Sequence, residues 1–135
     1  MSTRCRIGLK VGNKVESIYC HHDGYPRGIH SVGQTLKDHY NDLNKIKQLM
    51  DLGDISGLGE NPIADPKGWD LRLSSDHSMC IAYSTRGDTD IDKWIDESEE
   101  MYAKYASDSD AAFVYLYKDG AWHMLSGRPA TFVKF

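Results

Sequence analysis

The sequence lacks any long apolar run. No stretch approaches the roughly 20 apolar residues that a membrane-spanning helix requires. Its opening, "MSTRCRIGLKVGNK", alternates polar and apolar side chains and lacks the continuous apolar segment of a secretory signal. Both absences predict a protein that stays outside the membrane and acts in the cytoplasm.

Cysteine is also scarce. Cys5, Cys20 and Cys80 are an odd number of thiols at wide separations, whereas a disulfide framework needs paired cysteines. Free thiols are typical of a reducing compartment. The three cysteines are therefore predicted to be unpaired, in agreement with a cytoplasmic location.

An excess of basic charge is missing too. The first 50 residues hold eight Lys or Arg and four Asp or Glu, whereas residues 51–135 hold eight and sixteen, for a net charge of −4. Without a basic patch, direct binding to nucleic acid is not expected. The acids concentrate in residues 88–110, where they face only Lys93 and Lys104. An acidic face on one helix would steer the protein toward a basic groove of a partner, and the alternative is a solvated helix surface. The candidates for this face are Asp88, Asp92, Asp96, Glu99 and Glu100.

The composition that remains is that of an ordinary globular chain. With 135 residues, of which 40% are hydrophobic and 27% charged, one domain spanning 1–135 is expected. Alternating patterns predict a hairpin of residues 5–11 and 15–20 around Gly12-Asn13, and another of residues 113–117 and 122–125 around an Asp-Gly turn.

Helical periodicity separates these hairpins. Ser31 and Asp42 are predicted to cap two short helices, and a third helix is expected from about Asp90 to Tyr105. Residues 69–73 and 79–83 alternate as a further hairpin. The expected fold is α+β, with three hairpins in a mainly antiparallel sheet, about three helices and the order ββ-αα-ββ-α-ββ.

The stretch "YCHHDGYP" at residues 19–26 gathers reactive side chains. Cys20, His22 and Asp23 are candidates for a metal site or a nucleophilic centre. A second pair of metal ligands and an oxyanion-hole motif are both absent from the sequence pattern, and the same residues suit a structured turn. Neither a catalytic residue nor a cofactor is predicted.

Aromatic residues provide other candidates. Tyrosine and tryptophan combine a large contact area with a polar tip, which suits both ligand pockets and interfaces. The predicted pocket or interface residues are Tyr25, Arg27, Trp69, Arg72 and Tyr83. Stacking on Tyr25 or Trp69, with phosphate held by Arg27 or Arg72, would suit a small nucleotide.

Several segments together carry a resemblance. They are "TRCRIGLKV", "IYCHHDGYPRGIHSVGQTLKDHY", "LMDLGDISGLGE", "KGWDLR" and "VYLYKDGAW". Through most of its length the chain resembles a family of small, mostly uncharacterised phage and prophage proteins that share a hairpin, an H-x-DGYP turn and a following helix. His22 stands where the family usually has an aromatic residue. The resemblance implies a phage accessory protein in the bacterial host cytoplasm, where small non-enzymatic proteins often inhibit or sequester components of host defence.

Three functional hypotheses follow. The first is a non-enzymatic binding protein that inhibits a bacterial defence protein, such as a CRISPR effector or another nuclease, through its acidic 88–110 segment or its DGYP loop. The second is a sponge that sequesters a small nucleotide signal. The third is a metal-dependent or cysteine-dependent enzyme built on residues 20–23.

Overall fold

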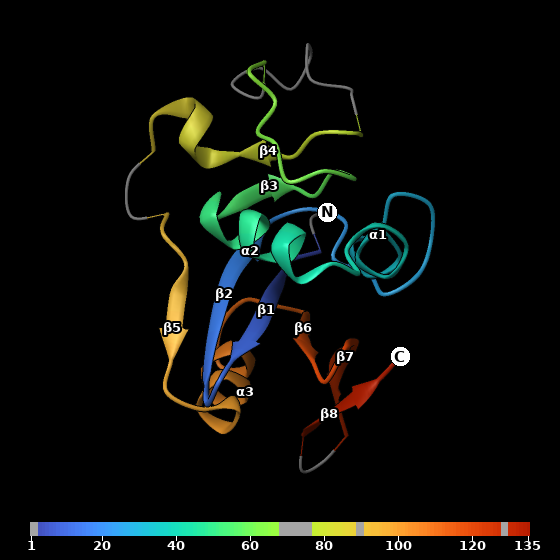
Figure 1. Ribbon diagram of the computed structural model, residues 1–135, viewed down its shortest axis with the longest axis vertical. Coiled ribbons are helices and arrows are strands. Elements are labelled where there is room, and N and C mark those ends of the chain that lie inside the picture. Colours follow the sequence, from blue (N-terminus) through green and yellow to red (C-terminus); the bar gives the residue numbers. More distant parts are fainter. Residues whose placement is uncertain (1–2, 68–76, 89–90, 128–129) are drawn as a thin grey trace.

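The computed structural model describes residues 3–67, 77–88, 91–127 and 130–135, which form one sheet with helices on both faces (Figure 1). The strands are β1 (Cys5–Val11), β2 (Lys14–Cys20), β3 (Ile55–Gly57), β4 (Ile81–Ala82), β5 (Trp94–Asp96), β6 (Phe113–Lys118), β7 (Ala121–Ser126) and β8 (Thr131–Lys134). The helices are α1 (Val32–His39), α2 (Leu43–Asp51), the 3-10 helix η1 (Tyr83–Arg86) and α3 (Glu99–Ser107). Within these residues, no helix is long and apolar enough to cross a membrane.

The sheet is mixed. Its strand order is β4-β3-β2-β1-β6-β7-β8, and β5 pairs with the N-terminal half of β2. The β1–β6 and β2–β3 pairs are parallel, and the other pairs are antiparallel. The prediction of a mainly antiparallel sheet of three hairpins is therefore wrong, although the fold remains α+β. The parallel pairs need crossover connections, which α1 and α2 provide before β3, and α3 provides before β6.

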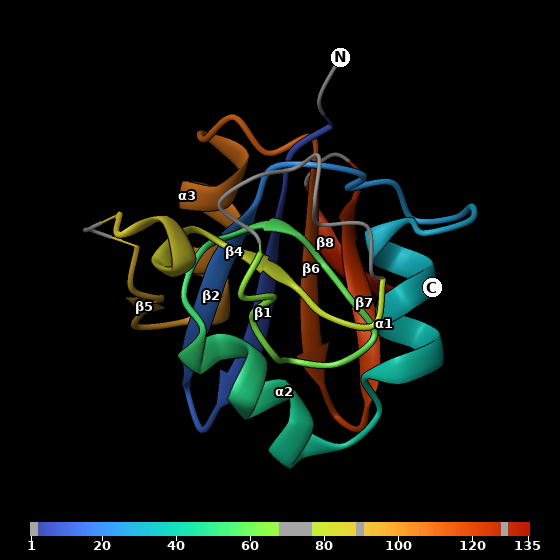
Figure 2. The same ribbon diagram turned by 90° about the horizontal axis from the view of Figure 1, so that it is seen from above.

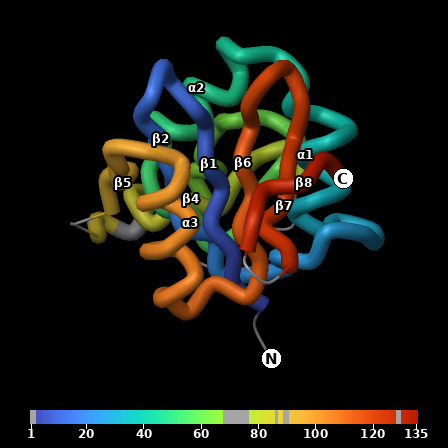
Figure 3. The backbone as a smooth tube through the Cα atoms, turned by 90° about the horizontal axis from the view of Figure 1, so that it is seen from below, coloured from blue at the N-terminus to red at the C-terminus, as the bar shows by residue number. Residues whose placement is uncertain are grey.

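The two faces of the sheet carry two apolar clusters. Alternate residues of β1, such as Ile7 and Leu9, point toward α1 and α2 and join the larger cluster. On the other face, Tyr102 and Ala106 of α3 pack against Val15, Val114 and Leu116. Figures 2 and 3, seen from opposite sides, show α1 and α2 on one side of β1 and β2 and α3 on the other.

The first and third predicted hairpins are confirmed. Gly12 adopts a positive φ of 62° at the β1–β2 turn, and Asp119 and Gly120 adopt φ of 52° and 75° between β6 and β7. The prediction missed β8, which extends the sheet beyond β7.

The second predicted hairpin is different. All of its first arm falls in 68–76, outside the described residues, and its other arm contributes β4, which pairs with β3. The sequence did not predict β3, because a strand of three residues leaves almost no periodic pattern.

The predicted helix from Asp90 to Tyr105 is also wrong in its first half. Trp94–Asp96 forms β5 instead, and the helix begins only at Glu99. Ser98 caps it, since its side chain accepts a hydrogen bond from the Met101 amide at 3.1 Å. Pairing with β2 therefore outweighs the helical spacing of residues 91–95.

The DGYP loop connects β2 to α1 and is tied to the sheet. The Gly24 amide donates to the Thr3 carbonyl at 2.9 Å, and the Tyr115 hydroxyl donates to the Gly24 carbonyl at 2.6 Å. A Cβ at Gly24 would lie 2.8 Å from that Thr3 oxygen, so the close approach requires glycine. The loop therefore has a structural role, because it fixes the entry into α1.

A close contact between β1 and α3 generates the first prediction. A Cβ at Gly8 would lie 2.8 Å from the ring of Tyr102, whereas one at Gly57 would make ordinary contact with Ile81 at 3.7 Å. Gly8→Ala should lower the free energy of unfolding by about 1–3 kcal/mol through overpacking. The matched control Gly57→Ala should change it by less than about 1 kcal/mol. Urea denaturation followed by tryptophan fluorescence measures both, and equal effects of the two substitutions would contradict the packing argument.

Candidate functional site

The predicted aromatic and basic candidates do not meet in a described cavity. Trp69 and Arg72 lie outside the described residues. Tyr25 and Arg27 are exposed on the loop before α1, and Tyr83 is half-buried at the start of η1. None of these three lines either of the two cavities described below.

The thiol in the 19–26 stretch is buried and has a structural environment. Cys20 is inaccessible to solvent, and its thiol donates a hydrogen bond to the His22 carbonyl at 3.5 Å. Its cross-strand neighbour Cys5 is equally buried, and burial raises the pKa of the Cys5 thiol well above its usual value. Burial also raises the pKa of Cys80 to about 11. All three cysteines are free, as predicted, but the environments of Cys5 and Cys80 disfavour the thiolate that nucleophilic chemistry needs.

The metal candidates Cys20, His22 and Asp23 do not form a ligand set. Asp23 is exposed and adopts a left-handed backbone with φ of 61°. The neighbouring His21 contacts the Tyr19 hydroxyl at 2.7 Å through Nδ1. In the described part of the chain, no group of three or more His, Cys, Asp or Glu side chains is placed to hold a metal ion.

The acidic candidates are distributed over four structural settings instead of one helix face. Asp88 follows η1 and Asp92 precedes β5, whereas Glu99 and Glu100 lie in the first turn of α3. Glu99 bridges two strands through ion pairs with Lys10 at 3.2 Å and Lys118 at 2.9 Å. The fifth acid, Asp96, is buried on β5.

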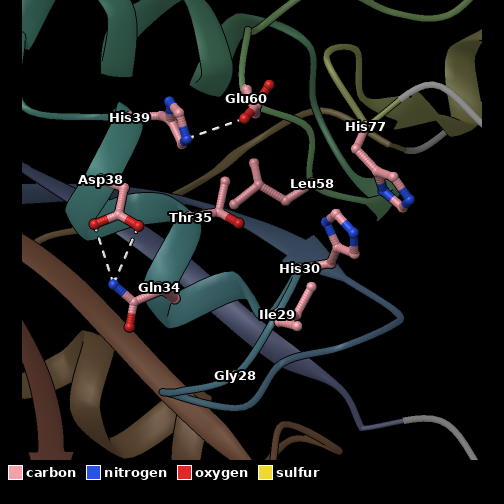
Figure 4. Close-up of a pocket in the computed structure, with 10 residues that line it drawn as sticks. All are labelled: Gly28, Ile29, His30, Gln34, Thr35, Asp38, His39, Leu58, Glu60 and His77. Atoms are coloured by element: carbon pink, nitrogen blue, oxygen red, sulfur yellow. Dashed lines mark hydrogen bonds and ion pairs between the residues drawn. The ribbon is translucent and has the colours of Figure 1, made fainter.

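One cavity, of about 480 Å³, lies between α1 and the segments around Leu58 and His77 (Figure 4). Its polar side chains already engage one another. Gln34 Nε2 donates to Asp38, and His39 Nε2 lies 3.1 Å from Glu60. The rings of His30 and His77 stack with centroids 3.6 Å apart. A ligand in this cavity would have to compete with these contacts.

A second cavity is a groove of about 550 Å³ between β5 and the C-terminal part of α3, which we call the β5–α3 groove. It is lined by Trp94, Ile95, Asp96, Tyr105, Asp108 and Ser109. Trp94 and Tyr105 are each 46% exposed, so two large aromatic side chains present much of their surface to solvent. Exposed apolar surface of this kind, next to acidic groups, marks an interaction site more often than a scattered single residue does.

Asp96 is the unusual group of this groove. The residue is only 9% exposed, and among the described residues its Oδ2 is a buried oxygen with no hydrogen-bond partner. Burial raises the pKa of this carboxyl group, and the positive charge of Arg6 opposes the rise only in part. A buried polar atom without a partner costs free energy, so Asp96 differs from the other groove residues in being a buried carboxyl group whose charge is incompletely compensated.

Arg6 forms the back of the same region. Its guanidinium carbon lies 3.7 Å from the centroid of the Trp94 ring, and its Nε donates to Ser17 Oγ at 3.2 Å. The register explains this meeting, because Ser17 pairs with Trp94 and Arg6 lies on the next strand. Arg6 thereby fixes the Trp94 ring at the groove.

Comparison with known proteins adds nothing to this geometry. No family model, no curated protein and no solved structure matches the chain. The choice of site therefore rests on the side chains described above.

Sequence analysis found part of this site. It selected Asp96 among the acids, but it predicted Trp94 and Tyr105 to lie in a single helix. Ser98 is the signal that would have assigned Trp94 and Tyr105 to different elements, because a serine followed by "EE" is typical of a helix start.

The buried thiols generate a second prediction. At pH 8, the three thiols should react with a chromogenic disulfide reagent at least about a hundredfold more slowly in the folded protein than in the unfolded chain, because reaction requires local opening. The three thiols are those of Cys5, Cys20 and Cys80. Absorbance measured with and without urea gives both rates. A thiol that reacts rapidly in the folded protein would contradict the buried placement.

The Glu99 ion pairs generate a third prediction, which concerns acid stability. Partial burial opposes ionisation of Glu99, but hydrogen bonds from Lys118 and Lys10 outweigh it and hold its pKa below the ordinary value of 4.5. The stabilisation is thus present above about pH 4.5 and is lost as the pH falls through the lowered pKa of the folded state.

Glu99→Gln should therefore lower the free energy of unfolding by about 1 kcal/mol or less at pH 7, and by less still at low pH. Urea titrations across pH 3–7 measure this dependence. Glu100→Gln, at an exposed position in the same helical turn, is the control. A loss that does not shrink toward low pH would contradict the role of the Glu99 charge.

Proposed function

We propose that this protein is a non-enzymatic, phage-type binding protein that inhibits a bacterial defence protein by docking its β5–α3 groove on a basic surface. The observation that carries this proposal is the combination of an exposed aromatic pair with a buried, incompletely compensated carboxyl group in one groove. Aromatic anchors beside a desolvated charge are typical of the residues that dominate the binding energy of protein interfaces.

The negative charge of the groove and of the whole chain also supports docking on a basic surface. Asp96 and Asp108 both line the groove, and the chain carries a net charge of −4. Such a field speeds encounter with a positively charged partner and disfavours negatively charged ones. A basic protein surface, such as the nucleic-acid channel of a defence nuclease, has the complementary charge.

The other two hypotheses have less support. An enzyme built on residues 20–23 would use a thiol that is buried inside the sheet. A nucleotide sponge would join Tyr25 and Arg27 with Trp69 and Arg72, but the first two line neither cavity. The last two lie outside the described residues.

The fourth prediction tests docking through the groove. The tagged protein is expressed in bacteria that carry defence systems, captured, and weighed intact by native mass spectrometry. A host protein should co-purify with the wild type in a fixed stoichiometry, and the wild type should inhibit it. The Trp94→Ala variant, whose groove is altered, should no longer inhibit that host protein. The purified partner's own activity, measured with and without each variant, is the decisive readout.

A matched control separates groove docking from general stickiness. Leu43 is also an apolar side chain that is 46% exposed, but its helix, α2, lies on the opposite face of the sheet from α3 (Figure 2). Leu43→Ala should leave capture and inhibition unchanged. Equal losses with both variants, or undiminished inhibition by the Trp94→Ala protein, would overturn the assignment of the docking site.

A further inference from the structure

We infer that the β5–α3 groove receives a lysine side chain of the partner, with the ammonium group at Asp96 and the methylene stem between Trp94 and Tyr105. This inference rests on the proposed function and specifies the chemistry of its ligand. It assigns one occupant to the groove, a primary ammonium on a flexible aliphatic stem.

The buried carboxyl group favours a positively charged ligand. Asp96 lines the groove, and among the described residues Oδ2 has no hydrogen-bond partner. Arg6 is the charged group that lowers the pKa of Asp96. Its guanidinium donates hydrogen bonds to the hydroxyl and the carbonyl of Ser17 at 3.1–3.2 Å. Because the donors of Arg6 are directed at Ser17, part of the negative charge of Asp96 is left for a ligand to compensate.

The geometry of the carboxyl group favours an ammonium over a guanidinium. Oδ2 is enclosed by protein, so a ligand in the groove reaches this group through its other oxygen alone. A guanidinium binds carboxylates best through two parallel hydrogen bonds, which need both oxygens. An ammonium is a compact charge with rotatable donors, and one oxygen is sufficient for it.

The remaining lining suits the rest of a lysine side chain. Trp94, Ile95 and Tyr105 offer apolar surface for its methylene groups, and the aromatic rings attract a cation. Asp108 lines the same groove and adds a second negative charge. Ser109 contributes little to recognition, since its hydroxyl already donates to the Ala106 carbonyl at 2.6 Å and accepts from the Ala111 amide.

In the described part of the chain, the cavity beside α1 has no buried carboxylate oxygen without a hydrogen-bond partner. Its side chains pair within the cavity, Gln34 with Asp38 and His39 with Glu60. The β5–α3 groove is thus the cavity whose lining includes a buried, unpartnered carboxylate oxygen in the described part of the chain.

The fifth prediction measures this specificity on the full chain. The isotope-labelled protein is titrated with three blocked amino acids, Nα-acetyl-lysine amide, the arginine analogue and the norleucine analogue, and the indole N–H of Trp94 is followed by NMR. Trp94→Phe identifies that signal. Lysine should bind with a dissociation constant on the order of millimolar, about tenfold more tightly than norleucine, which has the stem without the charge. Arginine should bind more weakly than lysine.

Two substitutions localise the ammonium. Asp96→Asn should weaken lysine binding about tenfold and leave norleucine binding unchanged, because the substitution removes the charge and retains the shape. Asp38→Asn, on α1 at the opposite face, should have no effect. Thermal unfolding followed by circular dichroism checks that each variant folds, and the three-ligand comparison on the wild type stands independently of the variants.

Each outcome decides the inference. Arginine binding equal to or tighter than lysine binding would overturn the ammonium assignment, and equal binding of norleucine would show that the groove recognises only apolar surface. Absence of any Trp94 shift would overturn it outright. Loss of partner capture in Trp94→Ala together with normal capture in Asp96→Asn would overturn the lysine inference while supporting the docking function, so the two proposals fail separately.

Discussion

The parallel pairing of β1 with β6 joins the two ends of the chain in one sheet. Cys5 to Leu9 align with Phe113 to Tyr117 residue by residue, and β1 pairs on its other edge with β2. A central strand must have both of its edges and both of its faces covered. The alternation along β1 meets this requirement, since Ile7 and Leu9 face the α1–α2 side and Gly8 faces α3.

The groove is a consequence of how closely α3 approaches this strand. Without a side chain at Gly8, the Tyr102 ring lies directly over β1, and its hydroxyl donates to the Tyr115 carbonyl at 2.7 Å. The helix is thereby anchored by Tyr102 in its middle and by Ala106 in its last turn, and Tyr105 of the same turn lines the groove. On the three-residue strand β5, Trp94 remains 46% exposed, whereas Asp96 is buried. A short edge strand beside an anchored helix thus produces a recess with both apolar and acidic walls.

The cavity beside α1 and the β5–α3 groove differ in whether their polar side chains have hydrogen-bond or ion-pair partners. In the cavity beside α1, Gln34, Asp38, His39 and Glu60 meet one another's hydrogen-bonding or charge requirements. In the β5–α3 groove, Arg6 compensates the negative charge of the buried Asp96 only in part, and a cation bound at its other oxygen would compensate more of it. Proteins tolerate such incomplete compensation mainly at sites that bind something, which is why an incompletely paired buried carboxylate is a stronger indication of function than cavity size.

The sequence by itself determined the local elements whose signals lie within a few residues. Gly12 and the Asp119-Gly120 pair specify their hairpin turns through positive φ angles, and Ser31 and Asp42 cap α1 and α2 through side-chain oxygens. Only the tertiary structure decided the parallel β1–β6 pairing, the conversion of Trp94–Asp96 from expected helix to strand, and the meeting of Asp96 with Tyr105. The reason is physical: a turn or a cap depends on neighbouring residues alone. Strand partners and buried charges depend on long-range contacts, whose free energy outweighs local helical spacing.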